Sequence, residues 1–231
     1  MSSITLKSSY INNEYGRLFK SLVLILRPKI CFEFGILDGF STIIIGHTLK
    51  KINNNGHLYS YDLFDEYSYS SGNRDEIISR IKRFGLKEYI TVNKGDLLKF
   101  EEEIEDDSID FMHVDISNNG TVLKKFLMKW NSKIKNGGCL IFEGGSPLRD
   151  EISWMKEYRK KRILPEILSN SILNRDYTYI ILHPYPSIMI CSKNIKLSSE
   201  TKSQLSKKLN YIGPTKSRIH ESDLIKLLEE I

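Results

Sequence analysis

The chain has 231 residues, of which 40% are hydrophobic, and its formal net charge at pH 7 is +5. This length fits one domain of ordinary size with small additions at its ends, and the apolar content suffices for one continuous core. Acidic and basic residues are mixed along the chain, which argues against sustained nucleic-acid binding, and no apolar run approaches the ~20 residues that a membrane-spanning helix needs.

The densest basic cluster is "KEYRKKR" at residues 156–162. A solvated helix face explains this cluster better than a site for a polyanion. Cys31, Cys139 and Cys191 are far apart and each lies in an apolar run typical of a strand, so we expect buried, reduced thiols. The N-terminus lacks the apolar core of a signal peptide. We therefore expect a cytoplasmic protein without membrane insertion.

Residues 11–27 carry apolar side chains at helical spacing, and Pro28 ends this helix. From there, predicted strands alternate with predicted helices. The strands are expected at 29–34, 57–62, 89–96, 108–116 and 139–143. The helices are expected at 41–52, 74–86, 97–104 (short and acidic), 121–135 (ending at Asn136-Gly137-Gly138) and 149–160. Ser41 or Thr42 is placed to cap the first of these helices, and Asn73 the second.

The alternation predicts a parallel sheet with helices on both faces. Residues 177–193 depart from this alternation, because their pattern predicts two strands joined by a turn with Pro184 and Pro186. Strands so closely joined must be antiparallel. The expected fold is α/β, a Rossmann-like doubly wound, mostly parallel seven-stranded sheet with an antiparallel C-terminal hairpin strand. We expect an N-terminal helical cap at 1–28, the main domain at 29–193, and a C-terminal helical appendage at 194–231 with a helix at 222–230.

The first predicted strand runs into a glycine-containing loop with the pattern E-x-G-x-x-x-G, from Glu33 through Gly35 to Gly39. The loop has no lysine, unlike a phosphate loop, and it lacks the G-x-G-x-x-G spacing of a dinucleotide loop. Gly35 permits a sharp turn, and Gly39 permits close approach of a ligand to the backbone. Glu33 places a negative charge beside the loop, which favours a cationic ammonium or sulfonium group over an anion.

The next two predicted strands end in acids. Asp62 is placed to accept hydrogen bonds from ribose hydroxyls, with Leu63 and Phe64 next to it to pack on an adenine face. Asp96 is placed to accept from an adenine amino group, with Leu97 against the ring. A helix cap or a turn residue remains the alternative for each aspartate.

The last two parallel strands also end in acids, at Asp115 and Glu143. Asp115 can orient an ammonium group, act as a base, or share a divalent cation with Glu143, because the two strands are expected to be neighbours. Glu143 can instead cap the following helix or pair with Arg149. His113, two positions before Asp115, is either a catalytic base or a hydrogen-bonded core histidine.

Together these pieces resemble a class I S-adenosylmethionine-dependent methyltransferase. The resemblance rests on the loop at 33–39, Asp62, Gly95-Asp96, "DFMHVD…GGCLIFE" at 110–143 and the terminal hairpin, and it covers about residues 29–193. Within that family, "FGILDGFST" and "DFMHVDISNN" are similar to bacterial small-molecule O-methyltransferases, which often modify sugars or secondary metabolites. Many of those carry "IDGDH" after the fourth strand and Asp-Asp or Asp-Asn after the fifth, which hold Mg²⁺ and support a base. This chain has Asp115-Ile116-Ser117-Asn118 and Glu143-Gly144 at these places.

The resemblance implies a site for S-adenosyl-L-methionine and methyl transfer to a hydroxyl of a small molecule, such as a sugar, a glycan precursor or a secondary metabolite. Its implied cofactor residues are Glu33, Gly35, Gly39, Ser41, Asp62, Leu63, Asp96, Leu97 and Asp115. The expected catalytic residues are Asp115, His113 and Glu143, and Asp115 and Glu143 are the candidate Mg²⁺ ligands. An NAD(P)-dependent oxidoreductase and a non-catalytic binding or assembly protein of the same fold stay open as alternatives, and so does a homo-oligomer.

Overall fold

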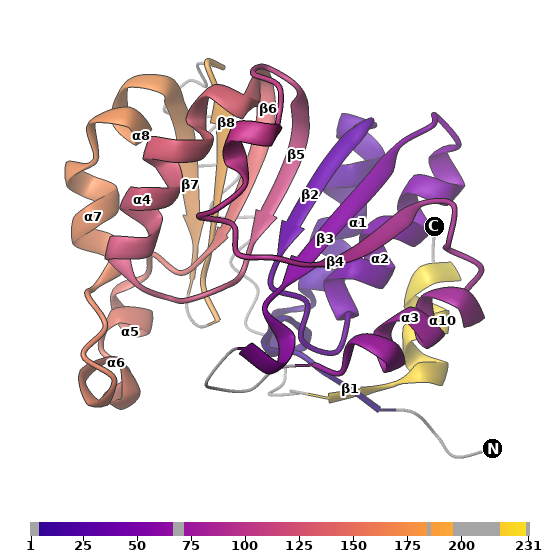
Figure 1. Cartoon of the computed structure of the whole chain (residues 1–231). Coiled ribbons are helices and arrows are strands. Elements are labelled where there is room, and N and C mark those ends of the chain that lie inside the picture. Colours follow the sequence, from indigo (N-terminus) through magenta and orange to yellow (C-terminus); the bar gives the residue numbers. More distant parts are fainter. Residues whose placement is uncertain (1–4, 67–71, 184–185, 196–217, 230–231) are drawn as a thin grey trace. The chain divides into compact units, whose positions relative to one another are not determined.

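The computed structural model of the chain describes residues 5–66, 72–183, 186–195 and 218–229 (Figure 1). It confirms the predicted α/β fold with a mostly parallel seven-stranded sheet. The chain forms two compact units, one of residues 1–96 with 213–231 and one of residues 97–212. Each unit is described by itself below. Within the described ranges, no helix is long and apolar enough to cross a membrane.

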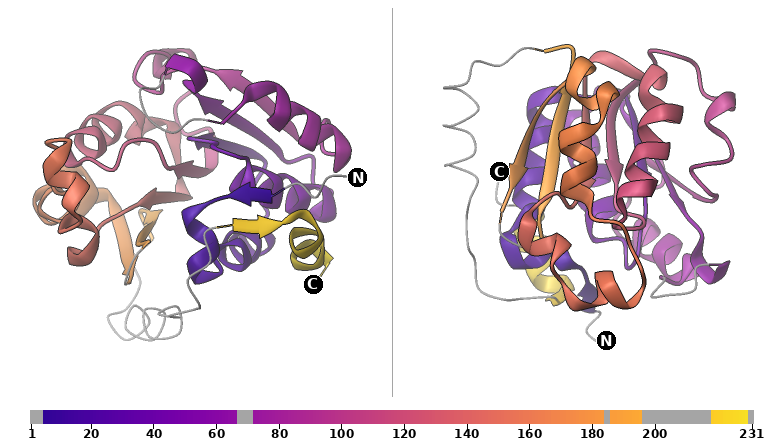
Figure 2. Two further views of the ribbon diagram at one scale, coloured as in Figure 1. Left: turned by 90° about the horizontal axis from the view of Figure 1, so that it is seen from below. Right: turned by 90° about the vertical axis from the view of Figure 1, so that its left-hand side faces the viewer.

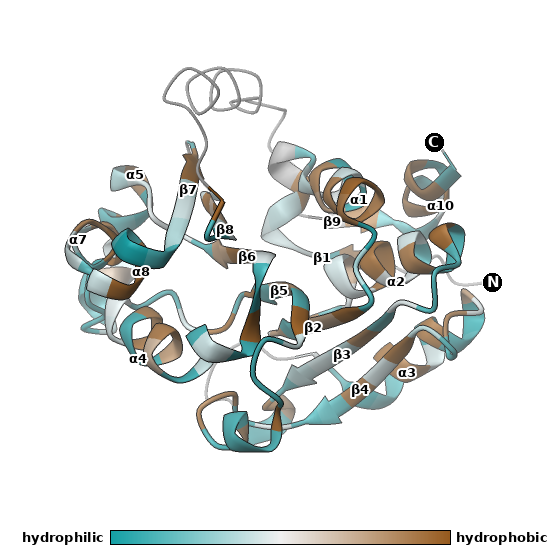
Figure 3. Cartoon of the chain, turned by 90° about the horizontal axis from the view of Figure 1, so that it is seen from above, coloured by the Kyte–Doolittle hydropathy of each residue, from teal (hydrophilic) through white to brown (hydrophobic). Residues whose placement is uncertain are grey.

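The first unit contributes three parallel strands in the order β4–β3–β2. Strand β2 spans Ile30–Phe34, β3 spans His57–Asp62 and β4 spans Ile90–Lys94. Strand β2 is buried along most of its length, as expected of a strand covered on both faces. Figure 3 shows the hydrophobic colour along β2 and α1.

Three helices accompany these strands: α1 at Tyr15–Leu26, α2 at Phe40–Ile52 and α3 at Arg74–Arg83. Helix α1 packs against α2. The predicted cap of α3 is confirmed, because the Asn73 side chain accepts hydrogen bonds from the backbone N–H groups of Asp75 and Glu76. The predicted caps of α2 are wrong, because its N-cap is Gly39, and Ser41 and Thr42 donate their hydroxyl hydrogens elsewhere.

Both ends of the chain join the first unit. Strand β1 (Thr5–Lys7) pairs antiparallel with β9 (Arg218–His220), and Figure 2 shows the indigo strand beside the yellow one. Helix α10 (Glu221–Glu229) follows β9. The sequence predicted this helix but neither of the two short strands. The three-part division expected from the sequence stays a prediction.

The second unit contributes four strands in the order β5–β6–β8–β7. Strands β5 (Ile109–Val114) and β6 (Ile134–Glu143) are parallel, whereas β8 (Ile188–Lys193) is antiparallel to both β6 and β7 (Tyr177–Leu182). The predicted antiparallel hairpin is therefore confirmed. Of the two prolines assigned to its turn, Pro184 lies outside the described residues.

Helices α4 (Gly120–Trp130), α7 (Ile163–Ser169) and α8 (Ser171–Asp176) pack together in this unit (Figure 1). Helix α4 buries one apolar face, formed by Leu123, Phe126, Leu127 and Trp130. The short helices α5 (Pro147–Asp150) and α6 (Ser153–Glu157) follow β6. The sequence did not predict α7 or α8.

Three predicted boundaries in this unit are wrong. The helix expected at 121–135 ends at Trp130 and a short 3-10 turn, so Asn136-Gly137-Gly138 lies inside β6 rather than at a helix end. The helix expected at 149–160 is split, because Ile152 has a non-helical backbone (φ −59°, ψ 135°) between α5 and α6. The short acidic helix expected at 97–104 shrinks to a 3-10 turn at Glu101–Glu103.

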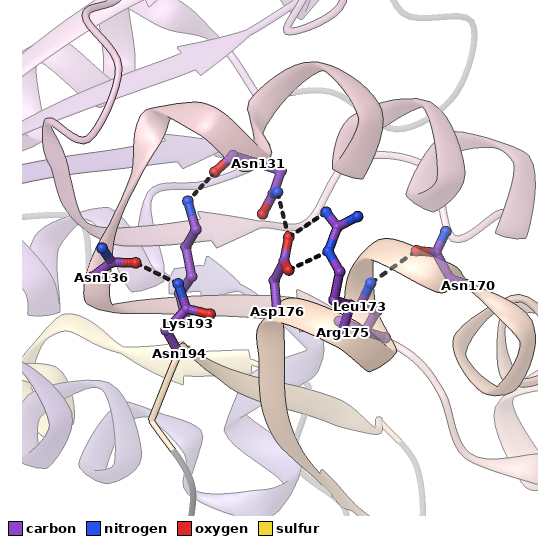
Figure 4. Close-up of polar contacts among 8 residues, drawn as sticks. All are labelled: Asn131, Asn136, Asn170, Leu173, Arg175, Asp176, Lys193 and Asn194. Carbon is purple, nitrogen blue, oxygen red and sulfur yellow. Dashed lines mark hydrogen bonds and ion pairs between the residues drawn. The ribbon is translucent and has the colours of Figure 1, made fainter.

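A polar network fastens the hairpin to the turn before β6 (Figure 4). The Lys193 ammonium donates to the carbonyl oxygens of Asn131 and Ile134. The Asn131 side-chain amide donates to Asp176 at 2.8 Å, and Arg175 forms an ion pair with the same carboxylate. The Arg175 guanidinium lowers the pKa of Asp176.

The three cysteines are buried free thiols, as predicted. Burial raises the pKa of the Cys139 thiol to about 12, so this side chain stays protonated at neutral pH.

Candidate active site

Glu33 lies at the base of the glycine loop and is fully buried. Its carboxylate accepts hydrogen bonds from three hydroxyl groups: Ser41 Oγ at 2.6 Å, Thr42 Oγ1 at 2.6 Å and Ser60 Oγ at 2.9 Å. These donors come from the start of α2 and from β3. Glu33 therefore joins β2 to α2 and β3, and Ser41 is turned towards this carboxylate.

The loop between β2 and α2 has a left-handed backbone at both of its glycines. Gly35 and Gly39 have φ angles of 93° and 82°. Any other residue would be disfavoured there by its Cβ, even though a Cβ at Gly39 would meet only ordinary van der Waals contacts, the nearest with Ile77 at 3.7 Å. The backbone conformation, rather than crowding, is what requires glycine at position 39.

Asp62, at the end of β3, holds the loop in place. Its Oδ2 accepts a hydrogen bond from Ile36 N at 2.7 Å, and its Oδ1 accepts from Phe64 N at 2.7 Å. The Gly35 N–H donates to the Tyr61 carbonyl oxygen at 2.9 Å. Because each carboxylate oxygen has two acceptor positions, Asp62 can still accept from a ligand hydroxyl while it holds the loop.

Two further residues, Asp38 and Arg80, support the loop, and the sequence did not predict their roles. The Asp38 carboxylate accepts from the backbone N–H of Lys7 in β1 at 2.7 Å. The Arg80 guanidinium, from α3, donates to the Asp38 carbonyl oxygen at 3.0 Å. No local pattern marks these contacts, because they join residues 31 and 42 positions apart.

The residues that were predicted to contact the adenine of the cofactor differ in how far they are buried. Leu63 is partly exposed after β3, whereas Phe64 next to it is buried. Asp96, the last residue of the first segment of the first unit, is partly exposed, and Leu97, at the start of the second unit, is buried. The Leu97 carbonyl oxygen accepts from the indole N–H of Trp130 at 2.8 Å. Residues 67–71, which include Tyr67 and Tyr69, lie outside the described residues.

In the second unit, the parallel register of β5 and β6 pairs Val114 with Phe142. Asp115 and Glu143 therefore lie at the same end of these two strands, as predicted. Asp115 is partly exposed, whereas Glu143 is buried and accepts a hydrogen bond from the Asn118 amide at 2.8 Å. His113 is fully buried inside β5, which favours its reading as a core histidine.

The residues at the two candidate sites differ in how well they suit S-adenosylmethionine and Mg²⁺, the two groups that the sequence implies. The amino-acid end of the cofactor suits the turn around Gly35 and Gly39 and the free backbone N–H groups with which any helix, such as α2, begins. The ribose suits the Asp62 carboxylate. A divalent cation usually takes several oxygen ligands, and no group of three acidic, cysteine or histidine side chains that could hold a metal occurs in the part of the chain that the structure describes. The Mg²⁺ site at Asp115 and Glu143 stays a prediction.

Residues 32–143 match the family model of a methyltransferase domain. No curated protein matches the chain significantly.

Solved structures share the fold. An O-methyltransferase from Bacillus cereus in complex with S-adenosylhomocysteine has a TM-score of 0.60 at 17% identity, over 77% of this chain and 80% of that one. The O-methyltransferase TomG from Streptomyces achromogenes, which is involved in tomaymycin synthesis and was crystallised with S-adenosylmethionine, has a TM-score of 0.58 at 14% identity, over 78% and 79%. The methyltransferase PaMTH1 from Podospora anserina has a TM-score of 0.59 at 11% identity, over 77% of each chain.

The matched segment runs from β2 to the end of β6, so it contains the glycine loop, Asp62, Asp115 and Glu143. Residues 32–143 thus match a methyltransferase domain, and the chain shares the fold of O-methyltransferases that were crystallised with S-adenosylmethionine or S-adenosylhomocysteine.

Proposed function

We propose that the chain transfers a methyl group from S-adenosylmethionine to a hydroxyl oxygen of a small molecule. The observation that carries this proposal is the glycine loop held by Asp62, within a domain that matches the methyltransferase family. Structural neighbours named as O-methyltransferases support the choice of oxygen. Among hydroxyl compounds, we infer a sugar, a glycan precursor or a secondary metabolite.

The first unit binds the cofactor in this proposal. The loop from Gly35 to Gly39 surrounds its amino-acid end, Asp62 accepts from its ribose, and Leu63 and Asp96 recognise its adenine. Glu33 supports the loop from below through its three hydroxyl partners. When bound, S-adenosylmethionine supplies an electrophilic methyl group on a positively charged sulfur.

The second unit handles the acceptor. Asp115 is partly exposed and holds the acceptor hydroxyl, whose proton it takes as the oxygen attacks. Glu143, oriented by Asn118, adds negative charge at the same strand end.

Calorimetric titration with S-adenosylhomocysteine tests the proposal. We expect the wild type to bind and Asp62→Ala to bind at least about tenfold more weakly, because hydrogen bonds to a charged group contribute about 1.5–3 kcal/mol and each 1.4 kcal/mol is tenfold in affinity. Asp65→Ala is the matched control, because Asp65 is an exposed aspartate three positions away that pairs with Lys94.

The same titration separates the alternatives. Lack of S-adenosylhomocysteine binding by the wild type would end the methyltransferase proposal, and binding of NAD(P) in its place would favour an oxidoreductase. Asp62→Asn keeps one oxygen for the backbone N–H of Ile36. Comparing its melting temperature with that of Asp62→Ala shows how much of the loss of affinity comes from a loosened loop.

We also propose a cytoplasmic location, which the buried free thiols support. The mixed charge of the chain supports a small-molecule acceptor rather than nucleic acid as partner. A homo-oligomer stays an expectation.

A further inference from the structure

Two cationic side chains meet one aromatic ring in the second unit, shortly after β6. The Cζ atom of Arg149, in α5, lies 4.3 Å from the centre of the Trp154 ring, in α6. The Lys160 Nζ atom lies 4.8 Å from the same centre. Both distances are within the ~6 Å over which a cation is attracted to an aromatic face. Arg149 is fully buried, whereas Trp154 and Lys160 are only partly buried and form the accessible edge of the group.

This group follows β6, whose last residue is Glu143. Burial lowers the pKa of Lys160, Arg149 lowers it further by repulsion, and the Glu143 carboxylate raises it. Glu143 therefore acts on Lys160 electrostatically, and its effect is smaller than those of burial and of Arg149. Two cations held together at a partly desolvated place repel each other, and a bound anion would relieve that repulsion.

Basic residues outnumber acidic ones in this segment. Residues 149–162 contain six basic and three acidic residues. The Asp150 carboxylate is occupied by the backbone N–H groups of Ile163 and Leu164, each at 2.8 Å. Glu151 forms an ion pair with Arg162 at 2.6 Å. The segment therefore keeps an excess of positive charge that suits an anionic ligand.

We propose that Lys160, held against the Trp154 ring, forms a subsite for an anionic group of the acceptor, a phosphate or a carboxylate, with Arg149 as a positioning residue at the same ring. The acceptor is then a hydroxyl compound that carries this anionic group near the hydroxyl to be methylated. The inference rests on the proposed function for what the site does, but its anion binding can be measured alone.

Tryptophan fluorescence gives a direct measurement, because the chain has two tryptophans and the other, Trp130, is fully buried. The protein is titrated with sodium phosphate and, separately, with sodium succinate, with sodium chloride holding the ionic strength constant. We expect a saturable change in wild-type emission with at least one of the two anions. Lys160→Met should weaken that binding at least tenfold, and Lys160→Arg, which keeps the charge, should restore most of it.

Lys156→Met is the matched control, because Lys156 is an exposed lysine of α6 and its loss changes the net charge equally. We expect this variant to bind the anion within twofold of the wild type. The proposal is overturned if the wild type shows no saturable change, or if Lys156→Met and Lys160→Met weaken binding equally. S-adenosylhomocysteine calorimetry on the wild type keeps the two proposals apart: anion binding without S-adenosylhomocysteine binding would sink the methyltransferase proposal and leave the subsite standing.

Discussion

The role of Glu33 is set by its three hydroxyl partners. The sequence suggested that this carboxylate adds charge to the cofactor site, and that role stays a prediction. The structure adds a second role, since Glu33 is fully buried and accepts from Ser41, Thr42 and Ser60. A buried carboxylate is tolerated only when it is well hydrogen-bonded, and here the bonds also fix the start of α2.

Glu33→Ala should therefore destabilise the fold strongly. The substitution leaves three buried hydroxyls without their acceptor, and each unsatisfied buried group costs about 1–3 kcal/mol, so we expect a loss of about 3 kcal/mol or more in the free energy of unfolding. Glu33→Gln keeps one acceptor oxygen and should lose less. Urea denaturation measures both losses.

Glu102→Ala is a suitable control, because Glu102 is exposed and its substitution should change the unfolding free energy by less than about 0.5 kcal/mol. If Glu33→Ala unfolds at the same urea concentration as the wild type, the three hydrogen bonds contribute little and Glu33 is free to serve the cofactor alone.

The candidate site could be predicted in part at this scale. Asp62, Asp115 and Glu143 were identifiable because each follows an apolar strand, and strand ends in a parallel sheet gather ligands. The partners of Glu33 could not be identified, because Ser41 and Thr42 look like helix caps in the local sequence and Ser60 looks like an ordinary strand residue. Only the pairing of β2 with β3 brings Ser60 beside Glu33.

Among the elements, α10 is held by an uncommon contact. Lys20, in α1, is 1% exposed, and its ammonium donates to the carbonyl oxygens of Leu227 and Leu228, both at 2.9 Å. The last carbonyls of a helix have no partners within the helix and carry partial negative charge, so a lysine is well suited to them. Lys20 thus joins the first helix of the chain to the last.

Lys20→Met should loosen α10 while keeping the apolar stem that packs inside the unit. We expect faster amide hydrogen exchange in residues 221–229 and little change in β3, measured by mass spectrometry of peptic fragments. Lys82→Met, at an exposed position of α3, should leave that exchange unchanged. Equal protection of α10 in the wild type and Lys20→Met would show that apolar contacts of Leu224 and Leu228 suffice to hold it.

The elements themselves were predictable where a local pattern sufficed. The hairpin at 177–193 and the five parallel strands follow from apolar runs separated by turn residues. The start of β6 could not be predicted in this way, because Asn136-Gly137-Gly138 has the composition of a helix end. In the structure, Gly137 adopts a φ of 83° within the strand. The pairing of β1 with β9 was also invisible, since it joins three-residue strands more than 200 positions apart.

At the scale of the molecule, the first unit depends on both ends of the chain. Residues from β1, α1, β9 and α10 complete a unit whose parallel strands lie between positions 30 and 94. His47, in α2, lies within this arrangement. Its Nδ1 atom is buried and, within the described residues, has no hydrogen-bond partner. The charged groups that act on it come from three helices: Lys20 of α1, Lys50 and Lys51 of α2, and Glu229 of α10.

Acid should therefore weaken the fold through His47. Burial lowers its pKa, and the three lysines lower it further, while Glu229 opposes them. Because the unfolded chain then binds a proton more readily than the folded chain, stability is fully present above the unfolded pKa of about 6.5 and is lost as the pH falls through that value towards the lower folded pKa. Urea denaturation at pH 7.5 and pH 5.5 should show a smaller acid-induced loss in His47→Gln than in the wild type. His220→Gln, at an exposed position of β9, should lose as much stability between pH 7.5 and pH 5.5 as the wild type. Equal losses in His47→Gln and the wild type would mean that other groups set the acid sensitivity of the fold.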